Sequence, residues 1–188
     1  MVRRKESTKV LALTQAGMTR RVIAYLLDWY LGAMLTALPI GILSQKLYGN
    51  MLHQDLSTLP EPYGIICGGI GMIGGLFYYI VIPLGRCKGQ TLGKRITRLK
   101  VIKKDGGDVD LKTILLRQLL GSIILEGSLY TVSYIGYQII QLSTGLQMVT
   151  GLSTISLGIG ILSALLATFH KNHQALHDII ARTKVIEV

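Results

Sequence analysis

Long apolar runs separated by short polar segments dominate the hydrophobic pattern of this chain. The runs cover about residues 21–43, 63–84, 118–140 and 146–169. Each is at or above the length of about 20 residues that an α-helix needs to cross a hydrocarbon layer of about 30 Å. The pattern therefore predicts an all-α membrane protein with four transmembrane helices.

The positive charges are distributed unevenly around these runs. Of the 20 Lys and Arg residues, all except Lys46 lie at or before the start of the first run, between the second and third runs, or after the fourth. Lys and Arg are enriched in cytoplasmic loops. We therefore expect both termini and the middle loop on the inner side of the plasma membrane. A third run that did not cross would leave the basic C-terminal segment outside, so the charges support four spans.

Composition agrees with a lipid environment. Hydrophobic residues make up 49% of the 188 residues and charged residues 16%, against about 25% charged in ordinary globular proteins. Mean hydropathy is +0.46. The net charge of +10 follows from the distribution of loop charges and needs no nucleic acid as partner. We divide the chain into a basic cytoplasmic segment, residues 1–18, and a transmembrane domain, residues 19–188.

Alternating residues in two segments predict a small cytoplasmic β-element. The middle loop reads TRLKVIKKDGGDVDLK over residues 97–112, with a turn signal at Asp105-Gly106 between two short strand-like runs. The segment TKVIEV, residues 183–188, has the same character. We expect these pieces to pair.

Glycines are concentrated in the second run, where residues 69–74 have the spacing G-x-G-x-x-G. A dinucleotide-binding turn with this spacing follows a strand and precedes an acidic residue about 20 positions later. Neither feature is present here. At helical spacing the glycines instead form a face on which another helix can pack closely. This face comprises Gly64, Gly68, Gly71 and Gly75.

Two carboxylates fall inside the predicted spans, where an ionisable group is costly and indicates a functional site. Asp28 lies seven residues beyond Arg21, on the same helical face, and Glu126 lies at a similar depth in the third run. If the two carboxylates face each other, a proton or small cation could bridge them. The alternative is a structural role, in which Asp28 pairs with an arginine or with hydroxyl groups.

Histidines and an aspartate follow the fourth run. His170, His173 and His177 lie on one helical face beside Asp178. Imidazoles can bind zinc and related ions, but histidines at the cytoplasmic end of a helix also interact with its dipole. The pattern leaves metal binding open, and we assign no metal and no cofactor. Because no catalytic spacing of residues occurs, we do not expect an enzyme.

Three blocks of sequence resemble the RDD family of membrane proteins. They are RVIAYLLD with Arg21 and Asp28, GQTLGKRITRLKVIKKDGG, and HQALHDIIARTKVI. The resemblance extends from about residue 19 to residue 186. It implies that Asp178 is the second family aspartate, and Glu126 belongs to no motif of the family. The small polar motif of the family is represented by Gly89, Thr91, Gly93 and Lys94.

The resemblance implies a bacterial-type membrane protein, with transport of small ligands, including cation/proton antiport, proposed for some members. We expect transport of a small cation, proton or small solute, or assistance to it. Asp28 would be the proton or cation site, Arg21 its charge partner, and Asp178 part of a cytoplasmic gate. Four helices enclose little volume, so a homo-oligomer is expected. The alternative is an accessory protein that binds another membrane protein through the glycine face and uses the three charged residues as a structural network.

Overall fold

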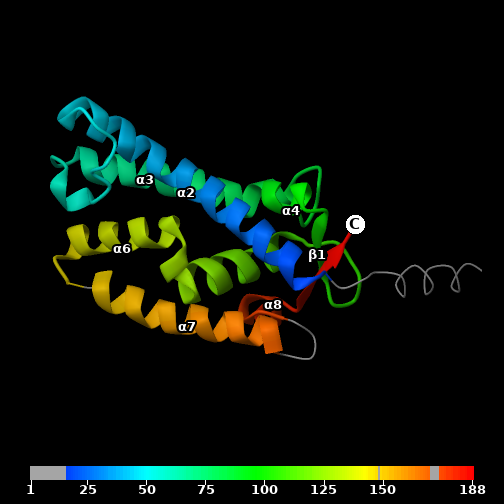
Figure 1. The fold of residues 1–188 in the computed structure, drawn as a ribbon. Coiled ribbons are helices and arrows are strands. Elements are labelled where there is room, and N and C mark those ends of the chain that lie inside the picture. Colours follow the sequence, from blue (N-terminus) through cyan, green and yellow to red (C-terminus); the bar gives the residue numbers. More distant parts are fainter. Residues whose placement is uncertain (1–15, 148, 170–173) are drawn as a thin grey trace, which may run out of the picture.

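Three long helical stretches organise the structure. The computed structural model describes residues 16–147, 149–169 and 174–188. Within them, three stretches are long and apolar enough to cross a membrane, and they match the first, second and fourth predicted spans (Figure 1). They are α2 (Met18–Tyr48), α7 (Val149–Phe169), and α3 (Tyr63–Leu76) continued by η2 (Phe77–Val81) and η3 (Ile82–Leu84).

The predicted third span is broken in the middle. Its first part consists of α5 (Leu111–Ile114) and the π-helical η4 (Leu115–Leu125); its second part consists of η5 (Gly127–Leu129) and α6 (Thr131–Thr144). The Ser133 hydroxyl donates to the Ile123 carbonyl at 2.7 Å across the break. Gly127 lies so close to Tyr137 and Ser133 that a Cβ would stand 2.7 Å from the Tyr137 hydroxyl. The expected single helix over 118–140 is therefore replaced by two pieces that meet at Glu126.

The expected β-element is confirmed as a two-stranded sheet. Strand β1 (Leu99–Lys103) pairs antiparallel with β2 (Thr183–Glu187), and Val101 lies opposite Val185. After β1, the Asp105 side chain accepts a hydrogen bond from the Gly107 N–H at 2.9 Å and forms the predicted turn. The short helices α4 (Leu92–Ile96) and α8 (Leu176–Ile180) each precede one strand. The sheet thus fixes the middle loop against a segment that follows α7.

Buried side chains form three clusters along the helices. One surrounds the sheet, one consists largely of tyrosines, and one lies at the opposite end, near η1 (Leu56–Thr58). Large apolar side chains also cover the outer surfaces of the long helices; Ile73 and Phe169, for example, are 68% and 80% exposed. Such surfaces suit a lipid environment, where exposed apolar groups cost nothing.

The glycine face of α3 packs inside this molecule. α2 and α3 lie side by side (Figure 1), and Gly71 faces the backbone carbonyl of Thr36 with no room for a Cβ. Gly75 lies against side chains of Thr36 and Val132, and Gly64 and Gly68 lie against Leu56 of η1. The prediction of a packing face is confirmed, but the face is filled by the chain's own elements. These four glycines are therefore occupied within the chain, and binding of a separate protein through them is not supported by this packing.

This packing predicts a large difference between two neighbouring glycines of α3. Gly71→Ala should destabilise the protein by about 1–3 kcal/mol, because the added methyl group collides with the α2 backbone. Gly69→Ala is the matched control, since nothing lies within 4 Å of a Cβ at that position and the gain in helix propensity is the same. Thermal unfolding in detergent measures both. Equal unfolding temperatures would contradict the close α2–α3 contact.

Candidate functional site

Asp28 of α2 is buried, with 3% of its surface exposed, and four donors surround its carboxylate. Oδ1 accepts from the Tyr78 hydroxyl at 2.6 Å and from the Gly93 N–H at 2.8 Å. Oδ2 accepts from the Thr91 hydroxyl and from Lys94 Nζ, the latter at 2.7 Å. Asp28 thus connects α2, η2 and the start of α4. Its charged partner is Lys94, and the expectation that Arg21 pairs with it is wrong.

Two glycines of the family motif allow the backbone to come close to its neighbours near this carboxylate: Gly89 lies against Val101 and Gly93 lies against Ala24 of α2. Gly89 has a φ of 76°; its N–H donates to the Pro83 carbonyl at 2.8 Å, and its carbonyl accepts from the Val101 N–H at 2.9 Å. A Cβ on Gly93 would lie 2.6 Å from the Ala24 carbonyl oxygen. Glycine is needed at both positions, at Gly89 for the left-handed conformation and at Gly93 for the approach to α2.

Asp178 of α8 is the partner of Arg21. Arg21 Nη2 donates to Oδ2 at 2.9 Å, whereas Arg117 of η4 donates to Oδ1 through Nε at 3.1 Å and Nη2 at 2.8 Å. The Thr183 hydroxyl of β2 completes the set at 3.0 Å. Asp178 is fully buried. One carboxylate therefore joins the start of α2 to η4 and to β2, although these segments are far apart in the sequence.

The environment of Asp178 favours its ionised form. Burial by itself would raise the pKa of this carboxyl, but the positive charges of Arg117 and Arg21, with His177 alongside, outweigh it. The pKa of Asp178 therefore lies below its ordinary value. A carboxylate held in this way acts as a fixed anion at neutral pH.

Glu126 occupies the break between η4 and η5 and bonds to α7 and α8. Its Oε1 accepts from the Ser163 hydroxyl at 2.6 Å and from the His177 backbone N–H at 3.2 Å. His177 Nδ1 lies 2.9 Å from Oε2. Within the described residues each carboxylate has its own donors, and no hydrogen bond joins Glu126 to Asp28. The expected shared proton or cation between these two groups is therefore not supported.

Of the three histidines in the predicted cluster, the structure describes His177. His177 contacts Glu126, and its Nε2 lies 3.8 Å from Asp178 Oδ2. His170 and His173 lie outside the described residues. In the part of the chain that the structure covers, no three His, Cys, Asp or Glu side chains come together to hold a metal ion.

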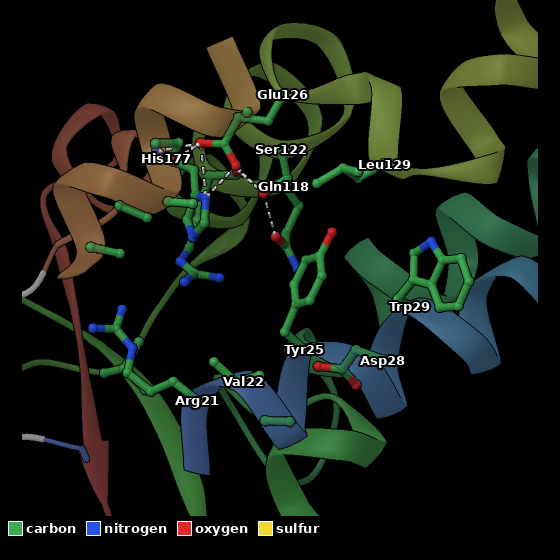
Figure 2. Close-up of a pocket in the computed structure, with 18 of the residues that line it drawn as sticks. Arg21, Val22, Tyr25, Asp28, Trp29, Gln118, Ser122, Glu126, Leu129 and His177 are labelled. Atoms are coloured by element: carbon green, nitrogen blue, oxygen red, sulfur yellow. Dashed lines mark hydrogen bonds and ion pairs between the residues drawn. The ribbon is translucent and has the colours of Figure 1, made fainter. Parts of the chain in front are cut away.

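A cavity of about 230 Å³, partly open to the outside, lies among these groups. Figure 2 shows Arg21, Tyr25 and Asp28 on the α2 side and Glu126 and His177 on the opposite side. Most of the remaining wall is apolar. The charged residues that line the cavity are Arg21, Asp28, Lys94, Arg117, Glu126 and His177.

Tyrosines form one wall of the cavity. Tyr25, Tyr79 and Tyr130 all line it, and the Tyr130 ring makes edge-on contacts with the rings of Tyr25 at 6.1 Å and Tyr79 at 5.3 Å between centroids. The Tyr79 hydroxyl donates to the Asp28 carbonyl at 3.0 Å. The Tyr25 hydroxyl is buried and has no hydrogen-bond partner among the described residues. The Tyr25 hydroxyl can therefore donate to a group that enters the cavity.

Several residues of the buried networks around the candidate site were missed by sequence reasoning. Arg117, Ser163 and Thr183 complete the buried networks, but none stood out in the sequence. Arg117 had the clearest signal, because it is a single charge between apolar residues in the segment LLRQLLG. Lys94 was assigned only by resemblance, since it lies within a basic loop whose charges were explained by membrane topology.

Comparison with known proteins places the chain in a family. The sequence profile of the RDD family matches residues 15–182. The chain is also similar to the uncharacterized protein YckC of Bacillus subtilis (strain 168), with 29% identity over 111 residues. That match covers 58% of this chain and 54% of YckC, so the matched region spans about half of the relative's length. No solved structure gives a significant match.

The buried Asp28–Lys94 pair predicts a strong effect of a neutral replacement. Asp28→Asn should destabilise the protein by about 3–5 kcal/mol, because Lys94 would remain buried without its counter-ion. The control is Asp108→Asn, which removes a surface ion pair with Lys100 whose aspartate side chain is 54% exposed. Such pairs contribute about 0–1 kcal/mol. Denaturation midpoints measure the two variants, and similar losses would show that the buried network is not structural.

The lowered pKa of Asp178 predicts a specific dependence of stability on pH. A carboxyl whose pKa is lower in the folded protein stabilises the fold above its unfolded value of about 4, and this stabilisation is lost as pH falls towards the folded value. Unfolding temperatures are to be measured from pH 7 down to about pH 3. Native protein should lose more of its stability over that range than Asp178→Asn, which should already be less stable at pH 7. Parallel curves would refute the assignment.

Proposed function

Since this chain belongs to the RDD family, we propose that it is a multi-pass membrane protein that moves, or helps to move, a small solute or cation together with protons. The observation that carries the proposal is the cavity on which charged side chains converge from α2, α4, η4, the break at Glu126 and α8. Charged groups inside a membrane domain are costly and mark solute or proton pathways.

In this proposal the two pieces that meet at Glu126 together form the third crossing, which adds to those of α2, α3 and α7. Both termini and the basic middle loop then lie in the cytoplasm, as the distribution of Lys and Arg favours. A broken helix at membrane depth is tolerated where the freed backbone groups are satisfied within the protein or line a cavity. The Ser133–Ile123 hydrogen bond supplies one such partner.

The Glu126–His177 pair takes the proton-carrying role in place of Asp28. Four donors, including a lysine, satisfy Asp28, so that it serves as a fixed structural anion. An imidazole can exchange protons near neutral pH. His177 and Glu126 both line the cavity and contact each other, so a change in charge there would alter the hydrogen bonds between the break and α8.

An accessory role is the second candidate, and the outer face of α7 favours it. Gly151 and Gly158 are exposed, and a Cβ at either position would meet nothing within 4 Å. This face offers close approach to another membrane helix. A homo-oligomer would use the same kind of contact.

Proton flux tests the transport proposal. The full chain is reconstituted into vesicles that contain a pH-sensitive dye, and gradients of Na⁺, K⁺, Li⁺ or inorganic phosphate are imposed at several pH values. We expect proton flux above that of empty vesicles with at least one gradient. Glu126→Gln should reduce it to the background, because the amide keeps the shape but loses the charge that pairs with His177.

The control for this experiment is Glu61→Gln, which changes an exposed carboxylate in the loop before α3 and should leave the flux unchanged. Flux equal to that of empty vesicles under every gradient would rule out transport and leave the accessory role. Undiminished flux in Glu126→Gln would instead remove the Glu126–His177 pair from the proton pathway.

A further inference from the structure

A second hollow adjoins the charged cavity and opens sideways. It has a volume of about 420 Å³ and lies between α2 and the η5–α6 segment. Four residues line both spaces: Tyr25, Trp29, Leu129 and Tyr130. Figure 2 shows Trp29 and Leu129 at one side of the cavity, away from Arg21. The two spaces therefore share a boundary at these side chains.

The side chains at this opening are apolar and exposed. Leu26 is 53% exposed, Trp29 42%, Leu129 44% and Tyr134 42%. They belong to α2 and to the segment on both sides of Tyr130, which the hydrophobic pattern assigns to the membrane. In a membrane-spanning chain such an opening faces acyl chains, and tryptophan and tyrosine are enriched where a protein meets the membrane interface.

The opposite end of the cavity is cationic. The guanidinium groups of Arg21 and Arg117 line the cavity, whereas Asp178, to which both bond, is fully buried behind them. Both guanidinium groups thus reach Asp178 on one side and the cavity on the other. Guanidinium groups bind carboxylates and phosphates through paired hydrogen bonds. The Tyr25 hydroxyl, between this end and the opening, offers a further buried donor.

The other charged groups of the wall are already engaged. Lys94 pairs with Asp28, and Glu126 bonds to Ser163 and His177. The charge of Asp28 is thus offset by Lys94, and both oxygens of Glu126 are held by donors of α7 and α8. Arg21 and Arg117 are the cationic side chains at the other end of the wall that an anionic group can meet.

We propose that the cavity and its side opening hold a membrane amphiphile with one acyl chain and a small anionic head, either a carboxylate or a phosphate. The head lies against Arg21 and Arg117, and the chain leaves between Trp29 and Leu129 into the lipid. Arg21 and Trp29 are eight residues apart on α2, about 12 Å along the helix, so the polar and apolar ends of the site are separated as they are in such a molecule. This assignment rests on the proposed function, in which the cavity binds a solute, and specifies the class of that solute.

The only tryptophan of the sequence, Trp29, makes the proposal testable by fluorescence. The full chain is placed in phosphatidylcholine nanodiscs, and dodecanoate brominated in mid-chain is added as a quencher. We expect saturable quenching of Trp29. Unlabelled dodecanoate and dodecyl phosphate should relieve it, whereas dodecyltrimethylammonium, acetate and inorganic phosphate should not.

Substitutions locate the bound head group and chain. Arg21→Gln should weaken binding about tenfold or more, as expected for loss of a charge-assisted hydrogen bond. Arg20→Gln is the matched control, because Arg20 pairs with Glu187 at an exposed position outside the cavity. Ala164→Phe fills part of the cavity without changing any charge and should also weaken binding, which keeps the test valid if Arg21→Gln does not fold.

Several results would overturn the proposal. Quenching that rises linearly without saturation, and is equal in Arg20→Gln, Arg21→Gln and Ala164→Phe, would mean simple partition into the lipid. Competition by dodecyltrimethylammonium would exclude an anionic head group. Competition by acetate or inorganic phosphate as strong as that by dodecanoate would assign the site to a free anion. Proton flux with no saturable quenching would reject the amphiphile and keep the transport function. Saturable quenching without proton flux would keep the amphiphile site and reject transport.

Discussion

Buried carboxylates determine how the segments of this protein meet, because a negative charge removed from water must be matched by donors or cations. Asp28 gathers α2, η2 and α4 around it, and Asp178 gathers α2, η4 and β2. Glu126 connects the break in the chain to α7 and α8. Apolar packing holds the helices side by side, but hydrophobic contacts are non-directional and do not select particular partners. The charges specify which ends come together.

The parts of the structure that depend on local pattern could be predicted from the sequence. The three long helices follow from the apolar runs. The two strands follow from the alternating segments before the turn at Asp105-Gly106 and at residues 183–188, whereas the run after the turn makes an isolated bridge between Asp108 and Ile102. The break at Glu126 was missed because hydropathy averages over a window and does not register a single carboxylate followed by a glycine and a serine. The segment EGS at residues 126–128 carried that information.

The candidate site was harder to predict, because its contacts join distant parts of the chain. Helical spacing places Arg21 and Asp28 on one face, yet it cannot say what each one meets. The partner of Arg21 lies 157 residues away, and that of Asp28 lies 66 residues away. Resemblance to the RDD family selected Asp28, Asp178 and Lys94 as notable residues but did not pair them. Pairing needed the geometry of the sheet and of α4.

The pairing of β1 with β2 has a consequence for biogenesis. Ribosomes make Asp178 and β2 after α2, α3, η4 and α7, so Arg21 and Arg117 enter the membrane region before their shared anion exists. Until Asp178 is made, both guanidinium groups lack the carboxylate that they share in the folded protein. The contacts that join α8 and β2 to α2, η4 and β1 can thus form only after the long helices have been made.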